Sequence, residues 1–153
     1  YRFPATFFVI TQFADDNKPG YMPWQQLSDM SRAGMEIASH TADHPDLRTR
    51  SLAFLQYELA GSKQTIELRL GVSVRSFAYP SGKYDARTLS VLQQSGYGAA
   101  VTEIQGMRQT SDKLLELKRI RIRGSYNITD YAFWLNWFAS RPDQRPSLFT
   151  PHG

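Results

Sequence analysis

The sequence predicts a single α/β domain built on a parallel β-sheet. Short apolar, β-branched runs alternate with segments of helical periodicity along nearly the whole chain, a pattern typical of β-α-β units. The 153 residues, 41% hydrophobic and 21% charged, suffice for one domain with a buried core. The sheet is expected to be open or rolled into a barrel. A complete eightfold barrel usually needs about 200 residues or more, so the chain is expected to form part of one.

Five segments carry the strand pattern. The first, residues 5–11, is continuously apolar and β-branched, which indicates a strand buried on both faces. The last alternates basic residues with isoleucines, which indicates a strand with one solvated face. In order, the four later strands are expected at residues 35–39, 72–79, 97–102 and 115–122.

Four segments carry the helix pattern, at about residues 22–34, 51–71, 86–95 and from 127 onward. Three follow a residue type that caps helix N-termini, and three precede a glycine suited to a helix C-terminus. The caps are Ser51, Asp85, and Asn127 or Thr129, and the glycines are Gly34, Gly71 and Gly96. Pro142 and Pro146 end the periodic part of the chain.

Composition restricts the kinds of partner. The net charge of +4 favours contact with anionic surfaces but does not specify a partner. Aromatic and basic residues do not alternate in the way that is typical of single-stranded nucleic-acid grooves, so a nucleic-acid partner is not expected. Because the chain has no cysteine, any metal must be held by His, Asp or Glu. No apolar run reaches the ~20 residues of a membrane span, and no signal peptide is visible. The chain starts at Tyr1 without a methionine, so we expect upstream sequence.

Two histidines follow the predicted strand at 35–39. His40 and His44 are four residues apart, a spacing that places both imidazoles on one side of a helical turn, within reach of one ion. Thr41 and Asp43 lie between them and can orient the rings. From the spacing alone, a surface loop with unspecialised histidines is the competing interpretation.

A second distinctive segment, Tyr79 to Gly82, follows the strand at 72–79. Parallel strands end at one edge of a sheet, so this turn should lie near the histidines. A glycine-containing turn there can aim a backbone N–H at a developing oxyanion, although a plain strand-to-helix connection is the competing interpretation. Arg119 can face the same edge. For the remaining candidates we expect solvent-exposed or structural roles: Asp15, Asp16, Trp24, Trp134, Trp137 and His152.

Together these segments resemble the polysaccharide deacetylases, the NodB-homology family also called carbohydrate esterase family 4. The resemblance runs in order through ATFFVI, MPWQQLSDMSRAGMEIASHTADHP, FAYPSGKYD, SGYGAAVT and LKRIRI. The FAYP form resembles the branch of poly-N-acetylglucosamine deacetylases. The most specific pattern is G-x-E-I-x-S-H-[ST]-x-x-H-P, which is fitted by Gly34, Glu36, Ile37, Ser39, His40, Thr41, His44 and Pro45.

The resemblance implies a distorted (β/α) barrel that binds a divalent metal, usually zinc, through one Asp and two His. It assigns His40 and His44 as metal ligands, Thr41 as a residue that shapes their loop, and the Ser81 backbone N–H as the oxyanion donor. Substrate would contact the turn at Tyr79, Pro80 and Gly82. The implied reaction removes N- or O-acetyl groups from a polymer such as poly-N-acetylglucosamine, a chitin-like glycan or a peptidoglycan-type glycan, outside the cell or in its envelope.

One part of the family pattern is not found in this sequence. The T-F-D-D motif supplies the general base and the aspartate ligand, and it should precede residue 1. We therefore expect residues 1–146 to form a partial deacetylase domain without its N-terminal strand or strands, followed by a tail at 147–153. Residues 1–153 alone should be inactive. The alternatives are an inactive glycan- or protein-binding module of the same fold, and another metal hydrolase acting on a small amide or ester.

Overall fold

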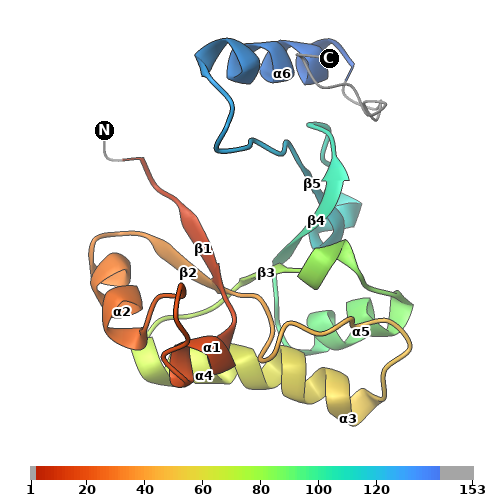
Figure 1. The fold of residues 1–153 in the computed structure, drawn as a ribbon. Helices are drawn as coiled ribbons and strands as arrows, with labels where there is room; N and C mark the ends of the chain where they lie inside the picture. The colour runs from red at the N-terminus through yellow and green to blue at the C-terminus, as the bar shows by residue number, and fades with distance from the viewer. Residues whose placement is uncertain (1–2, 142–153) are drawn as a thin grey trace.

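A computed structural model describes residues 3–141 of the chain. Its centre is a five-stranded sheet in which every neighbouring pair is parallel (Figure 1). The strands lie in the order of the sequence: β1 (Thr6–Val9), β2 (Glu36–Ser39), β3 (Ser76–Ala78), β4 (Ala99–Gln105) and β5 (Leu117–Arg119). The predicted α/β class and parallel sheet are confirmed. Within the described residues the sheet is open, with β1 and β5 as its edges.

Helices connect the strands. The α-helices are α1 (Thr11–Asp15), α2 (Trp24–Arg32), α3 (Leu52–Leu55), α4 (Ser62–Leu70), α5 (Ala86–Gln94) and α6 (Ile128–Ser140). A π-helical stretch, η1 (Gln56–Gly61), joins α3 directly to α4, so the long helix predicted at 51–71 is continuous. Two 3-10 helices complete the set, η2 (Pro80–Gly82) and η3 (Ser111–Glu116).

The predicted helix caps are confirmed. Ser51 accepts a hydrogen bond from the Phe54 N–H, and the Asp85 side chain accepts one from Thr88. The Asn127 side chain caps α6 by accepting the N–H groups of Thr129 and Asp130, the second and third residues of the helix. At the other end of the long helix, Gly71 adopts the left-handed conformation with a φ of 69°.

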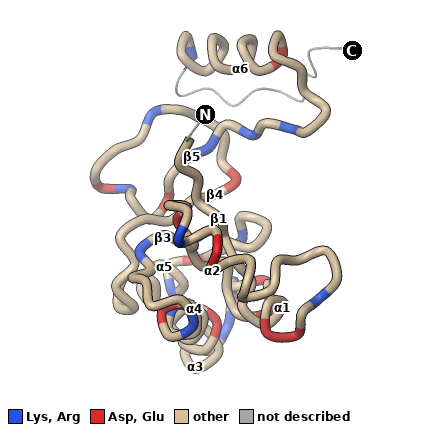
Figure 2. The backbone as a smooth tube through the Cα atoms, turned by 90° about the vertical axis from the view of Figure 1, so that its left-hand side faces the viewer, with Lys and Arg blue, Asp and Glu red and all other residues tan. Residues whose placement is uncertain are grey.

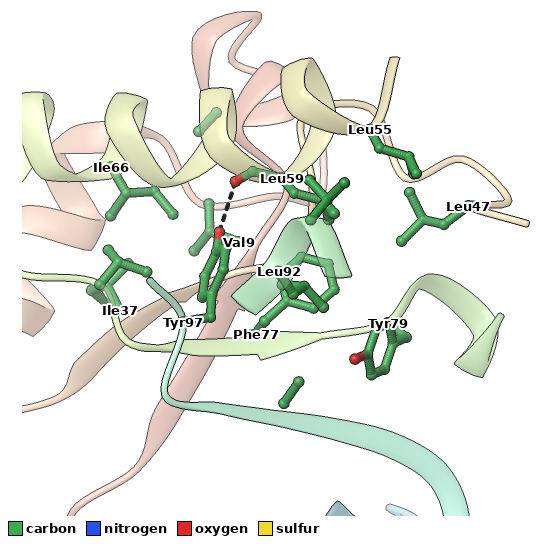
Figure 3. Close-up of a cluster of buried hydrophobic side chains, with 14 of the residues drawn as sticks. Val9, Ile37, Leu47, Leu55, Leu59, Ile66, Phe77, Tyr79, Leu92 and Tyr97 are labelled. Atoms are coloured by element: carbon green, nitrogen blue, oxygen red, sulfur yellow. Dashed lines mark hydrogen bonds between the residues drawn. The ribbon is translucent and has the colours of Figure 1, made fainter. Parts of the chain in front are cut away.

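The hydrophobic core lies between the long helix and the strands. Leu55, Leu59 and Ile66 are fully buried and pack in one cluster with Ile37 and Phe77 (Figure 3). Leu52, which we expected on the same stripe, is 51% exposed. Residues 51–53 are all exposed, so the helix enters the packed layer only at its second turn.

Several boundaries differ from the sequence prediction. β1 pairs only with β2 among the described residues, and it has an exposed first residue and two half-buried phenylalanines. The prediction of a strand buried on both faces is therefore wrong. Residues 11–15 form a helix, β3 begins only at Ser76 and β5 ends at Arg119. Ile122, beyond that end, is 44% exposed, which contradicts the expected strand to 122.

The aromatic helix α6 stands apart from the other helices in both views (Figures 1 and 2). Trp134 and Phe138 are buried and Phe133 is 40% exposed.

Acidic and basic positions are mixed along the chain, with a basic run between β5 and α6 (Figure 2). No helix within residues 3–141 is long and apolar enough to cross a bilayer. The predicted breaks at Pro142 and Pro146, the tail at 147–153 and His152 lie outside the described residues.

Candidate active site

The two predicted metal ligands lie side by side at the end of β2. The strand finishes at Ser39 and places His40 directly after it. Thr41 and His44 then adopt left-handed backbone conformations, with φ values of 72° and 61°. This path turns the imidazole of His44 back toward that of His40, and the ring centroids are 4.8 Å apart at an interplanar angle of 76°.

The hydrogen bond of His40 decides which of its nitrogens can bind an ion. Nδ1 lies 2.6 Å from the carbonyl oxygen of Ala78 in β3. Because a carbonyl oxygen can only accept, Nδ1 carries the proton and Nε2 keeps a free lone pair. Burial lowers the pKa of His40 below its ordinary value of 6.5, which favours the neutral ring that a metal requires.

Thr41 ties the backbones of the two histidines together. Its side chain is fully buried, and its hydroxyl donates to the carbonyl oxygen of His40. The hydroxyl oxygen of Thr41 in turn accepts the N–H of His44 at 2.9 Å. The Thr41 hydroxyl therefore links the backbones of His40 and His44 from within the loop.

The second predicted segment directly follows the residue that His40 contacts, Ala78. The η2 turn starts two residues after Ala78, whose carbonyl accepts the His40 proton. Ser81 is exposed and has a φ of 51°. The N–H groups of Gly82 and Lys83 donate to the carbonyls of Tyr79 and Pro80, both at 3.0 Å, and neither bond uses the N–H of Ser81.

Burial changes the part that the turn can play. Tyr79 is 1% exposed, and its hydroxyl donates to the carbonyl of Leu115 at 2.7 Å. Pro80 is buried as well. The side chain of Tyr79 belongs to the hydrophobic core, and contact of Tyr79 and Pro80 with substrate stays a prediction. Gly82 has a φ of 63°, and a Cβ there would lie 3.0 Å from the Cβ of Glu103, so the turn passes close to β4.

Charged residues from β4 and β5 complete this edge of the sheet. A cavity of about 480 Å³ is lined by Glu103, Gln105 and residues 119–122. The Nε of Arg119 donates to the Thr102 carbonyl at 2.7 Å. Besides burial, the hydrogen bond to Ala78 and the charge of His44, the charge of Arg119 lowers the pKa of His40 and that of Glu103 raises it. A second cavity, about 310 Å³, borders both imidazoles and is otherwise lined mainly by apolar residues of β1, α1 and α2.

Comparison with known proteins decides the family. Residues 1–100 match the family model described as Polysaccharide deacetylase. The chain belongs to the polysaccharide deacetylase family. A chitooligosaccharide deacetylase of Azorhizobium caulinodans is 32% identical over 93 residues, covering 60% of this chain and 41% of that protein.

Solved structures of polysaccharide deacetylases share the fold. The Streptococcus pyogenes deacetylase PplD, in complex with acetate, matches with a TM-score of 0.76 and 32% identity over 80% of this chain and 54% of that one. BC0361, a polysaccharide deacetylase from Bacillus cereus, matches with a TM-score of 0.77 and 27% identity over 88% of this chain and 42% of that one. The chain thus spans about half of these relatives or less.

The two imidazoles of this chain have donor atoms that would fit part of a zinc site. Their chemistry and proximity suit a tetrahedral ion. Residues 3–141 bring no third His, Asp or Glu into a group with them. Asp15 is engaged elsewhere, because its Oδ1 accepts hydrogen bonds from Trp24 and Arg69, both at 2.8 Å. Asp15 is the last residue of α1, and not part of a solvated loop. Its two hydrogen bonds are consistent with a structural role.

Sequence reasoning missed one buried residue that contacts the histidine loop, Glu58. It is 1% exposed and lies in η1. Its Oε2 accepts the N–H groups of Ala42 and Asp43, at 3.0 and 3.1 Å. The available signal was a carboxylate between Leu55 and Leu59 on the buried side of a helix, where a charged residue is rare unless it has partners.

Proposed function

We propose that this chain supplies two histidine ligands and the oxyanion donor of a metal-dependent polysaccharide deacetylase. The observation that carries the proposal is the pair of imidazoles 4.8 Å apart, one of them fixed by Ala78 with its Nε2 free. The η2 turn with the proposed oxyanion donor, Ser81, begins two residues after Ala78. Ligand and donor are therefore held by the ends of neighbouring strands.

The side chains and backbone have distinct roles in this proposal. His40 and His44 would hold a divalent ion, most suitably zinc, through ring nitrogens. When bound, such an ion polarises an acetyl carbonyl and lowers the pKa of a water molecule. The N–H of Ser81 would donate to the carbonyl oxygen as it gains negative charge. The absence of a side chain at Gly82 keeps the turn close to β4, and Thr41 keeps His44 in place.

For the substrate we propose a polymer that contains N-acetylglucosamine. Chitooligosaccharide deacetylases of Azorhizobium caulinodans and Sinorhizobium fredii are 32% and 30% identical to parts of this chain. The three candidates are poly-N-acetylglucosamine, a chitin-like glycan and a peptidoglycan-type glycan. Polymers of this kind lie outside the cell or in its envelope, and we propose that location for the enzyme.

The test measures zinc affinity and acetate release with the protein at its natural full length. We expect His44→Ala to weaken zinc binding by at least about tenfold and to abolish acetate release from a chitooligosaccharide. The control is Gln93→Ala on the exposed face of α5, which should leave both quantities unchanged. Unchanged zinc affinity in the His44 variant would overturn the metal assignment. Glycan binding without acetate release by the unaltered protein would indicate a binding module instead.

A further inference from the structure

A buried carboxylate contacts the histidine loop from a different element. Glu58 reaches from η1 to the two residues at the centre of the loop, and its Oε2 accepts both of their N–H groups. Its second oxygen, Oε1, is buried and makes no hydrogen bond within the described part of the chain. Burying a carboxylate with half of its acceptor capacity unused is costly, so stability alone does not account for a glutamate here.

We propose that Glu58 is a positioning residue, which fixes the peptide units between His40 and His44 so that both imidazoles face one ion. This inference rests on the proposed function. The N–H groups of residues 42 and 43 bind Glu58, and that of His44 binds Thr41. Three consecutive amides are thus fixed by side-chain oxygens, which defines the backbone path from one ligand to the other.

The carbonyl groups of the same loop are fixed from the opposite side. The carbonyls of Thr41 and Ala42 accept the N–H groups of Thr11 and Gln12, at 3.2 and 3.0 Å. Ala42 is therefore held by its N–H and by its carbonyl. With the glutamate removed, α1 would still hold one side of the loop while the amides of residues 42 and 43 would lose their acceptor.

The π-helical stretch η1 determines the position of Glu58 relative to the histidine loop. Carbonyl groups of a π-helix are displaced from α-helical geometry, and such stretches often occur at functional sites. Here Ser62 donates to the carbonyl of Glu58 at 2.6 Å, and Tyr97 donates to that of Leu59 at 2.9 Å (Figure 3). The Ser62 hydroxyl also lies 2.8 Å from that of Ser39, the residue before His40. The contact between Ser62 and Ser39 thus fixes the position of the helix relative to the end of β2, which His40 follows.

The chain contains a matched control on the same continuous helix. Glu67 accepts the N–H of Val74 at 2.9 Å, so it too holds a loop backbone, but one that carries no ligand. We compare Glu58→Ala, Glu58→Gln and Glu67→Ala in the full-length protein. Zinc affinity is measured by competition with a chromogenic chelator, and amide hydrogen exchange is measured in the metal-free protein.

We expect Glu58→Ala to weaken zinc binding about 10- to 100-fold and to speed exchange at the amides of Ala42 and Asp43. Glu58→Gln retains one acceptor oxygen and should recover part of the affinity; it also carries the test if the alanine variant does not fold. Glu67→Ala should speed exchange at Val74 and leave zinc affinity unchanged.

Two outcomes separate this inference from the proposed function. If His44→Ala weakens zinc binding while both Glu58 variants bind like the unaltered protein, Glu58 is only structural and the inference is overturned. If His44→Ala also binds zinc like the unaltered protein, the metal assignment itself fails, and the positioning role fails with it.

Discussion

Thr41 is a β-branched residue held at a φ of 72°, a conformation that costs energy for such a side chain. Its hydroxyl offsets that cost by bonding both histidine backbones. Replacing it with valine keeps the shape and leaves the His44 N–H without an acceptor. We expect Thr41→Val to lower the free energy of unfolding by about 1–2 kcal/mol, measured by urea denaturation, and to weaken zinc binding. Thr41→Ser should retain both properties; equal zinc affinity in the valine and serine variants would contradict the role of the hydroxyl.

Glu58 and Glu67 should affect stability with opposite pH dependence. Burial is the main cause that raises the pKa of Glu58 above its ordinary 4.5, whereas the hydrogen bond from Lys63 lowers that of Glu67. Because the pKa of Glu58 is higher in the folded protein than in the unfolded one, its contribution to folding stability is complete below pH 4.5. That contribution is lost as the pH rises through the pKa of the folded protein. Because the pKa of Glu67 is lower in the folded protein, its contribution to folding stability is present above pH 4.5 and is lost as the pH falls.

Glutamine variants of the metal-free protein isolate these two contributions. Relative to Glu58→Gln, the unaltered protein should become less stable as the pH rises from 4.5 toward neutral. Relative to Glu67→Gln, it should lose stability as the pH falls below 4.5. Urea denaturation across this range measures both differences. Slopes of the same sign would show that the environment of Glu58 does not favour its protonated form.

At the scale of residues, the sequence predicted that His40 and His44 act together, but it could not predict which residues support their loop. The four-residue spacing and its flanks identify His40 and His44 as one unit. The contact of Glu58 with Ala42 spans 16 residues along the chain. It depends on the register of a π-helical stretch, for which local composition carries no signal.

Among the elements, the η2 turn offers a sharp test because Gly82 combines a φ of 63° with a close approach to Glu103. An alanine in the left-handed conformation costs about 1–2 kcal/mol, and here the new methyl also meets β4. We expect Gly82→Ala to lower stability by at least that amount and to reduce acetate release by displacing Ser81.

Gly96→Ala is the matched control for this turn. Gly96 has a φ of 77°, but nothing lies within 4 Å of an added Cβ. This variant should lose only about 1–2 kcal/mol in thermal or urea denaturation and retain full activity. Equal activity losses in the two variants would show that backbone strain alone, and not the position of the turn, accounts for the effect.

The order and type of most elements followed from periodicity, whereas their lengths did not. Val74 was predicted to lie in a strand, but it precedes β3 and is 1% exposed. Its apolar side chain indicated burial correctly, and burial does not require strand pairing. The short helix α1 was missed for a related reason. The N–H groups of Thr11 and Gln12 bond to the histidine loop, so tertiary contacts stabilise a segment that locally continues a strand pattern.

At the scale of the whole molecule, parallel pairing gathers the candidate site. The histidine loop follows β2 and the η2 turn follows β3, while Glu103 and Arg119 come from β4 and β5. Because parallel strands end at a common edge, the rule that predicted this gathering needed no knowledge of individual contacts. What the rule could not supply is the spacing of the side chains, which depends on the left-handed residues of both loops.

The same arrangement predicts how residues 1–153 behave on their own. Within residues 3–141 the site has two imidazoles and no third ligand grouped with them, and a zinc site normally uses three protein ligands and a water. In the family pattern, the aspartates of the T-F-D-D motif precede the strand that corresponds to β1. We therefore predict that residues 1–153 alone bind zinc at least about tenfold more weakly than the full-length protein and release no acetate from a chitooligosaccharide. If they did release acetate, and His40→Ala abolished it, a carboxylate within this chain would have to act as the base. Glu103 would then be the first residue to replace, because it is an acidic residue of β4 that lies against Gly82 of the η2 turn.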